Sequence, residues 1–383
     1  MKPLLGIVLV LALGFVTSRR WFGRLKTWGR SRFFYLTGEE FLLVGWVLGP
    51  SVTNLLDPGV LAGLEPFVGL GLGYLGFVFG MQFDRRGLRQ VPGRFVAASL
   101  VQSAVVWAAL AAGLTWVLSR WMPVQPALVA ALAATGVGTS TSFLYLVDRA
   151  THWGRDPAFR FLRFSSVFDD LWGVLAFGLA LACLHGLGPV WALVTLAVAG
   201  LSAGILLLAT RLSLDPREEM LVLLGTALFT GGLAAYLKVS PVLANALGGF
   251  AFRSLTPGGE RYLDRLLRVE KPIYLFMLVV AGAWWSFSEG GVLLATGVYV
   301  ACRAAGKWVG GAAAAGVLGR AGHGATMGWG LLAQSEMSVA LMVNLFVLYP
   351  NPGTRLGASA VFLAVLVNDL WSSAHFHRSY GRA

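Results

Sequence analysis

Two adjacent aspartates, Asp169 and Asp170, lie in the otherwise apolar stretch VFDDLWGVLAFGLAL (167–181). Two neighbouring carboxylates repel each other when both are charged, so one of them tends to keep a proton or to take up a cation unless a base is close by. An ionised side chain at membrane depth is also costly, and such residues usually face a partner or a water-filled cavity. The pair therefore suits the reversible exchange of a proton for a metal cation.

The amino-acid composition indicates that these aspartates lie in a membrane-spanning segment. Hydrophobic residues make up 57% of the 383 residues and charged residues 13%, and the mean hydropathy is +0.71. These values are outside the range of soluble domains, and apolar runs long enough to cross a bilayer of about 30 Å recur along the chain. An alternating strand pattern is absent. The sequence thus predicts an all-α polytopic membrane protein that forms a single membrane domain over residues 1–383.

Thirteen transmembrane helices are expected, and the first is interpreted as a retained helix because it lacks a small-residue cleavage site. The expected spans are 3–17, 39–56, 67–83, 95–119, 126–147, 164–185, 189–210, 219–237, 240–252, 272–288, 290–318, 326–349 and 356–375.

The basic residues predict the orientation. Of the 30 Lys and Arg residues, 24 fall in the loops that follow odd-numbered spans or in the C-terminal tail. Basic residues prefer the cytoplasmic side, so the N-terminus is expected outside and the C-terminus inside. This topology and anionic lipid headgroups account for the net charge of +12, and no nucleic-acid partner is expected.

Four further ionisable residues are expected at membrane depth, away from the span ends: Arg303, Lys307, Glu336 and Asp369. Arg303 and Lys307 are four residues apart, so they share one helix face, and a carboxylate is the expected partner of that face. Lys307 could act as a competing counter-ion, whereas Arg303 suits a permanent pair. Simple pairing for assembly, or snorkelling of Arg303 to the interface, are the alternatives.

Two spans contain polar interruptions, ATGVGTSTS (134–142) in the fifth and AQSEMS (333–338) in the twelfth. Transporters with inverted repeats bind ions where two such discontinuous helices meet. The triplets 94–185 and 289–376 run in opposite directions in the expected topology and are predicted to form the ion-translocating core, with the other helices as a scaffold. Close packing through small residues is the alternative interpretation of 134–142, and it is the preferred one for the GxxxG spacings between Gly69 and Gly80.

The motif VFDDLW is echoed by LVNDLW (366–371) in the last span. The two aspartates differ in their expected depth, so the echo is treated as chance. Asp369 is expected to pair with an arginine or to line the ion path.

Enzyme and cofactor motifs are absent. The two cysteines, Cys183 and Cys302, are isolated, and the sequence contains no HExxH, GxSxG or GxxxxGK[ST]. No cofactor is expected. A remote alternative is an intramembrane aspartyl protease, but adjacent acids are too constrained to flank one peptide bond.

Several segments together resemble the monovalent cation:proton antiporters, and in particular the bacterial sodium/proton antiporter-like proteins, over residues 40–370. The segments that carry this resemblance are LGFVFGMQFDRRGLR (75–89), ALAATGVGTSTSFLYLV (131–147), SSVFDDLWGVLAFGLAL (165–181), SPVLANALGGFAFRS (240–254), RAAGKWVGGAAAAG (303–316) and GWGLLAQSEMSVAL (328–341).

This resemblance implies roles for individual residues. Asp170 would bind the transported monovalent cation or a proton, while Asp169 would pair with Lys307 when no cation is bound. Thr135 and Gly136 would supply oxygen ligands. Arg303 and Glu336 remain charge partners of the site.

The resemblance also implies the activity. The expectation is electrogenic exchange of a monovalent cation, Na+ first and K+ or Li+ as alternatives, for H+ by an elevator-type motion. A homodimer in the lipid bilayer of a bacterial inner membrane is expected. A K+/H+ antiporter, or a channel or sensor on the same fold, is the main alternative.

Overall fold

The computed structural model describes residues 38–151, 157–186, 188–212, 215–287, 291–319 and 328–380. These residues are almost entirely helical, and the β pairing among them is one isolated bridge. Seven of the described helices are long and apolar enough to cross a membrane, and two shorter apolar helices accompany them. The expected first span, 3–17, lies outside the described residues.

The helices have the following bounds: α4 (Glu40–Leu48), α5 (Pro58–Met81), α6 (Arg85–Gln90), α7 (Gly93–Leu118), α8 (Pro126–Thr135), α9 (Thr141–Thr151), α10 (Pro157–His185), α11 (Gly188–Ala209), α12 (Pro216–Tyr236), α13 (Pro241–Leu255), α14 (Glu260–Ala283), α15 (Val292–Val317), α17 (Glu336–Leu348) and α18 (Pro352–Tyr380).

Most helix positions agree with the sequence expectation, but two kinds of boundary differ. The fifth expected span is divided into α8 and α9, and the twelfth is interrupted before α17. The helix α14 begins at Glu260, twelve residues before the expected start at 272. Its first turns carry charged residues at helical spacing, and a search for apolar runs cannot detect a helix of that kind.

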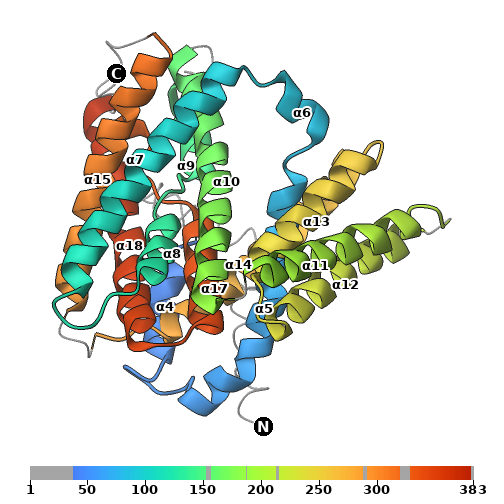
Figure 1. Cartoon of the computed structure of the whole chain (residues 1–383), viewed down its shortest axis with the longest axis horizontal. Coiled ribbons are helices and arrows are strands. Elements are labelled where there is room, and N and C mark those ends of the chain that lie inside the picture. Colours follow the sequence, from blue (N-terminus) through green and yellow to red (C-terminus); the bar gives the residue numbers. More distant parts are fainter. Residues whose placement is uncertain are drawn as a thin grey trace.

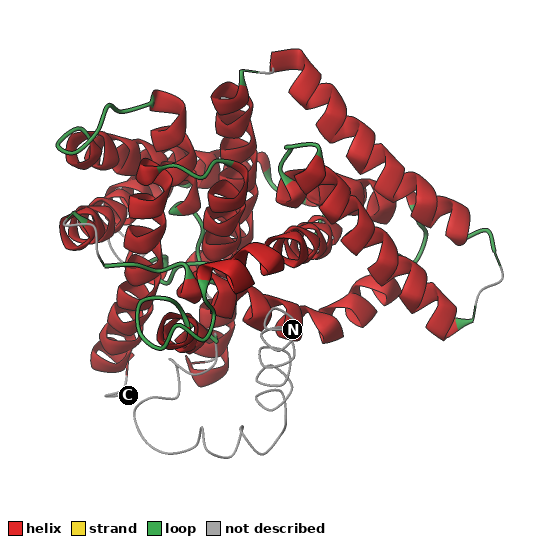
Figure 2. Cartoon of the chain, turned by 90° about the horizontal axis from the view of Figure 1, so that it is seen from below, coloured by secondary structure: helices red, strands yellow, loops and turns green. Residues whose placement is uncertain are grey.

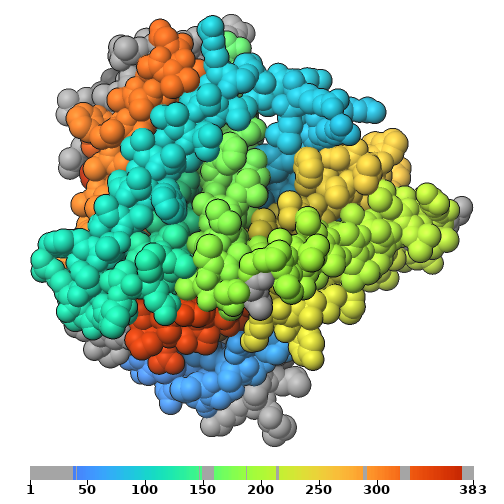
Figure 3. Space-filling model, in the orientation of Figure 1, coloured from blue at the N-terminus to red at the C-terminus, as the bar shows by residue number. Residues whose placement is uncertain are grey.

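The helices form two groups (Figure 1). In the core group, α15 packs on α7 and α18, and α10 packs on α8; α9 and α17 complete it. In the scaffold group, α5 packs on α12 and α13, α11 packs on α13, and α14 packs on α4. Helix α17 also contacts α5, α13 and α14 of the scaffold. The ends of these helices are joined by mostly short connections (Figure 2), and α11, α12 and α13 form the right-hand part of the surface in Figure 3.

Three helices of the scaffold group, α5, α12 and α13, begin with the same capping arrangement. An Asp or Ser caps the first turn and is followed directly by proline, as at Asp57, Asp215 and Ser240. The cap side chain accepts a hydrogen bond from a free backbone N–H of the first turn, while proline has no N–H to satisfy and is already fixed at a helical φ.

Glycines allow the helix backbones of the scaffold to touch. A Cβ atom on Gly80 of α5 would lie 1.9 Å from the carbonyl oxygen of Ala246 in α13. At Gly73 the nearest atom would be the Cα of Gly231 in α12, at 2.2 Å. The glycine spacing in α5 therefore serves helix packing, as the sequence indicated.

Gly80→Ala is expected to lower the free energy of unfolding by about 1–3 kcal/mol, because the added methyl group must push two backbones apart. Thermal unfolding in detergent measures this effect. Gly225→Ala in α12 is the matched control, because no heavy atom lies within 4 Å of its added Cβ. An equal loss of stability in both variants would contradict the packing argument.

Candidate functional site

The two interrupted helices cross and pair at their breaks. Thr139, in the break between α8 and α9, forms an isolated antiparallel bridge with Gln334, which precedes α17. The backbone N–H of Ser140 donates to the carbonyl of Ala333 at 3.0 Å. The two polar interruptions seen in the sequence thus meet in the core group and leave several backbone groups outside any helix.

Arg303 of α15 satisfies the carbonyls freed at both breaks. Its Nε donates to the carbonyl of Gly136 at 2.9 Å and its Nη2 to that of Gly138 at 2.7 Å. On the other break, its Nη1 donates to the carbonyl of Leu332 and its Nη2 to that of Ala333 at 3.3 Å. The side chain is fully buried.

This arrangement corrects the expected carboxylate partner of Arg303, and it excludes snorkelling. The C-terminal ends of α8 and of the helical turn 328–330 both point at the guanidinium, and helix C-termini carry partial negative charge. A guanidinium presents five donors in a fixed plane, so it can serve several carbonyls at once. The carbonyl dipoles at these two helix ends therefore supply the negative partner charge that a carboxylate was expected to supply.

Lys307, one turn further along α15, pairs with Asp169. Its Nζ lies 2.8 Å from Asp169 Oδ2 and also donates to the carbonyl of Val137 and to Thr139 Oγ1, each at 2.7 Å. Both members of the pair are fully buried. A buried charge pair is tolerated only when hydrogen bonds satisfy its remaining polar atoms, and here they do.

Asp169 is saturated with donors. Oδ1 accepts from Ser103 at 2.9 Å and from Ser165 at 3.2 Å, while Oδ2 accepts from Thr139 at 2.7 Å in addition to Lys307. With both oxygens occupied, this carboxylate has little capacity for a further ligand.

Asp170 is in the opposite situation. Oδ2 accepts one hydrogen bond, from Ser335 Oγ at 2.9 Å, and Oδ1 is buried with no hydrogen-bond partner among the described residues. Ser335 is held by its own role as N-cap of α17. Gly138 lies so close that a Cβ there would be 2.2 Å from Asp170 Oδ1. An unpartnered carboxylate oxygen in a dry protein interior is costly, so a proton or a cation is needed there.

Asp170 borders a cavity of about 270 Å³, which we call the Asp170 cavity. Its polar walls come from both groups of helices. The polar lining residues are Gln82, Thr141, Ser142, Asp170, Glu270, Lys271, Ser335 and Glu336. Acidic side chains outnumber the lysine, so the cavity favours cations.

The structure shows the contacts of Thr135 and Gly136, the two expected oxygen ligands. Neither residue lines the Asp170 cavity. The hydroxyl of Thr135 donates to its own helix at Leu132 and lies 3.3 Å from the hydroxyl of Tyr299. The Gly136 carbonyl is occupied by Arg303. The hydroxyl oxygen beside Asp170 belongs to Ser335, which precedes α17 at the second break.

Glu336 hydrogen-bonds to Ser142 across the crossing, at 3.1 Å. It faces the Asp170 cavity, whereas the hydrogen bonds of Arg303 go to backbone carbonyls. Glu270 and Lys271 share that cavity but were not singled out in the sequence, because they were assigned to the loop 253–271. The charged amphipathic start of α14 was the signal that could have revealed them.

Asn368 and Asp369, in the second member of the sequence echo, also contact the crossing. The backbone N–H of Gln334 donates to Asp369 at 3.3 Å, and Asn368 donates to the Gln334 side chain at 2.8 Å. The acid pair of α10 contacts the crossing from one side and this pair of α18 contacts it from another. The sequence analysis compared the depths of the two aspartates by counting residues from the ends of their spans, and that count did not reveal these contacts. The breaks in the two crossed helices change the depth at which each neighbouring helix reaches the crossing.

The crossed broken helices, with buried charges at their meeting point, define a membrane transporter. The family model described as "Sodium/hydrogen exchanger, transmembrane" matches residues 5–370, and the chain therefore belongs to this family. This confirms the resemblance to cation:proton antiporters. Members of this family are transporters and not enzymes, so the protease alternative is excluded.

A solved structure supports the fold. The sodium proton antiporter MjNhaP1 from Methanocaldococcus jannaschii, described at pH 8, superposes with a TM-score of 0.65 at 17% sequence identity. The match covers 98% of this chain and 97% of the other. At this identity the likeness bears on the fold alone. By sequence comparison, no curated protein gives a significant match.

Arg303→Met is expected to destabilise the protein by about 3–5 kcal/mol, because it leaves buried carbonyls of two breaks without donors. Thermal unfolding in detergent measures the loss. Arg163→Met is the control, since Arg163 forms a partly exposed pair with Asp148 at 3.3 Å and such pairs contribute about 0–1 kcal/mol. Similar melting temperatures for both variants would show that Arg303 does not hold the crossing together.

Proposed function

We propose that this chain exchanges a monovalent cation, Na+ in the first place, for protons across a bacterial inner membrane. The observation that carries the proposal is Asp170, which lines a cavity with acidic walls and whose Oδ1 has no hydrogen-bond partner among the described residues. One carboxylate that needs either a proton or a cation, but has no room for both, couples the two by competition.

The two aspartates would have different roles in the exchange. Asp170 binds the cation through its carboxylate, with Ser335 Oγ as a neighbouring oxygen at 2.9 Å. Asp169 serves as the fixed partner of Lys307. Hard monovalent cations prefer oxygen ligands, and carboxylate, hydroxyl and carbonyl oxygens are the groups present here.

Lys307 would make the exchange electrogenic. If only Asp170 gives up a proton for one cation, the summed charge of Asp169, Asp170, Arg303 and Lys307 plus the bound ion is unchanged. If the arriving cation also displaces a proton from Lys307, two protons leave for one cation and net charge moves. A lysine ammonium can lose its proton when buried, whereas the guanidinium of Arg303 stays charged.

Alternating access would come from motion of the core group against the scaffold group. The triplets α7–α10 and α15–α18, close to the expected 94–185 and 289–376, would be inverted repeats that carry the crossing as one body. The antiparallel bridge between the two breaks supports opposite orientations of the repeats. Contacts between the groups would then break and reform, among them the hydrogen bond from Asn344 to Ser240 at 2.6 Å.

The cavity would open to the cytoplasm in this conformation. Gln82 and Lys271 line it, and they adjoin the strongly basic segments 84–94 and 253–271. Basic segments favour the cytoplasmic side, which would place the N-terminus outside and the C-terminus inside.

A homodimer through the scaffold group would leave the core free to move. Exposed apolar side chains of α11 and α12, such as Leu193, Leu196 and Phe229, are available for that contact or for lipid.

Asp170→Asn is expected to abolish exchange, because the amide can neither lose a proton nor offer a negative charge to the cation. The measurement uses liposomes with an interior pH dye and an acidic interior, to which Na+, K+ or Li+ is added outside. Wild-type protein should alkalinise the interior with the transported cation. Asp264→Asn makes the same chemical change at an exposed position and should keep wild-type rates. Exchange by the Asp170→Asn protein would refute the assignment.

Lys307→Met combined with Asp169→Asn is expected to leave exchange that no longer responds to membrane potential, because the second proton carrier is gone. The double variant avoids an unpaired buried carboxylate, which alone could cost about 3–5 kcal/mol. Rates are compared with and without an imposed potential, and Lys238→Met, at an exposed lysine, is the control. A potential dependence equal to wild type would remove Lys307 from the proton pathway.

A further inference from the structure

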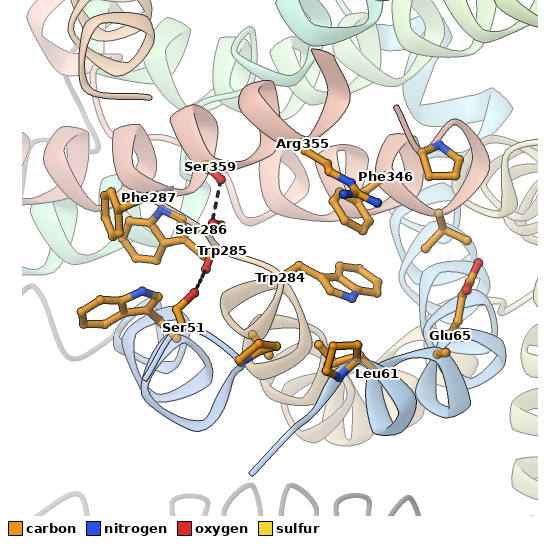
Figure 4. A pocket seen from close by; sticks show the side chains of 17 residues that line it. Ser51, Leu61, Glu65, Trp284, Trp285, Ser286, Phe287, Phe346, Arg355 and Ser359 are labelled. Atoms are coloured by element: carbon orange, nitrogen blue, oxygen red, sulfur yellow. Dashed lines mark hydrogen bonds between the residues drawn. The ribbon is translucent and has the colours of Figure 1, made fainter. Parts of the chain in front are cut away.

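The buried Asp169–Lys307 pair lines neither of two cavities in the described part of the chain. The lining of the Asp170 cavity contains neither residue. A second cavity, of about 760 Å³, is lined by residues such as Glu65 and Arg355 and by no residue of α7, α10 or α15, the helices that surround the pair (Figure 4). A second proton that enters or leaves through Lys307 therefore needs a route of its own.

Two parallel helices, α7 and α10, form matched layers beside this pair. Each helix contributes one residue per turn to three layers. The layers are Phe95 with Phe161, Ser99 with Ser165, and Ser103 with Asp169. The rings of the first layer are in contact, with centroids 5.6 Å apart, and the third layer is joined by a hydrogen bond of 2.9 Å. Because side chains four residues apart lie on one helix face, the two serines of the middle layer share this register.

Two polar side chains on this face of α7 are buried and have no hydrogen-bond partner among the described residues. They are the hydroxyl of Ser99 and the amide of Gln102, whose nitrogen and oxygen are both unpartnered. Both residues are 0% exposed. Three- and four-residue spacings place Ser99, Gln102 and Ser103 on one helix face. Unpaired buried polar groups are costly, and proteins commonly satisfy them with internal water that makes about three hydrogen bonds.

These polar groups lie between Lys307 and the basic end of the core group. Helix α15 packs closely on Gln102, because a Cβ on Gly310 would be 2.9 Å from the Gln102 carbonyl oxygen. Gly310 is three residues from Lys307, which is about one helical turn. Ser99 is about 9 Å from the start of α7 at Gly93, by the helical rise per residue. The basic segment 84–94 leads into that start.

The serine hydroxyls are oriented to pass a proton to Asp169. Ser103 and Ser165 both donate to Oδ1, so each oxygen keeps lone pairs that can accept from water. When a serine oxygen takes a proton from water, its own proton moves to Oδ1. A half-turn of the carboxyl group then brings this proton to Lys307 Nζ, which becomes an ammonium and leaves Asp169 ionised. Proton release follows the same steps in reverse.

We propose that Ser99, Gln102, Ser103 and Ser165 hold internal water that relays protons between the Asp169–Lys307 pair and the side of the basic loops. The ligand of this site is water, and the species that moves is a proton. The relay is separate from the cation path through the Asp170 cavity. The Phe95–Phe161 contact covers its outer end, where a cation would have to shed its water. The inference rests on the proposed antiport, in which Lys307 carries the second proton.

Turnover and cation affinity together test the relay in liposomes with an interior pH dye. Ser99→Ala removes the hydroxyl, and Gln102→Leu replaces the amide by an apolar group of similar size. Each is expected to lower the maximal rate of cation-driven pH change by about tenfold and to keep the KM for the cation within about twofold of wild type, because only the second proton loses its path. D2O should slow both variants more than wild type, since proton transfer has become the slow step.

Ser202→Ala is the matched control. Ser202 of α11 is also 0% exposed, and its hydroxyl also has no partner among the described residues, but it lies in the scaffold group. Its loss should change neither the turnover nor the response to D2O. Wild-type turnover and a wild-type D2O response in both Ser99→Ala and Gln102→Leu would overturn the relay even where exchange is present, and so would an equal slowing in Ser202→Ala.

Thermal unfolding in detergent gives a readout that does not need transport. In a water-filled site, Gln102→Leu takes a partner from the water and should not raise the melting temperature. A dry site would become more stable when its unpaired amide is removed, so a raised melting temperature would overturn the proposal. If wild-type protein shows no cation-driven pH change, the antiport is overturned, and this comparison alone decides whether the site holds water.

Discussion

The buried guanidinium of Arg303 is the interaction on which the site depends. Two helices stop in the middle of the protein, and each leaves carbonyl groups that water would satisfy at a surface. Arg303 reaches carbonyls of both breaks from a third helix, α15. A single side chain thereby satisfies the freed backbone, neutralises the negative ends of two helix dipoles and fixes how the two breaks cross.

With the crossing fixed, two side chains of the same type acquire different chemistry. Asp169 points to Lys307 and three hydroxyl groups, whereas the neighbouring Asp170 points to one hydroxyl and a cavity. Successive residues on a helix are rotated by about 100°, so adjacent acids necessarily face different surroundings. In the proposed antiport, the pair would combine a fixed counter-ion with an exchangeable ligand, which a single aspartate could not provide.

The scaffold contributes one wall of the Asp170 cavity. Helices α5 and α14 of the scaffold group line this cavity, and α17 of the core group contacts both of them. The glycines of α5 let α12 and α13 approach to backbone contact, which makes the scaffold a compact body.

The sequence by itself determined the membrane class, the family, most helix positions and the pairing of Asp169 with Lys307, because each follows from local composition, from helical spacing or from family motifs. It did not reveal that Thr135 and Gly136 lie outside the lining of the Asp170 cavity, and it missed Glu270 and the contact of Asp369 with the crossing. Those positions depend on where two breaks from distant segments meet and on which carbonyls they free. Side-chain spacing along one helix carries no information on that meeting point, so only the tertiary structure decided which oxygens surround Asp170.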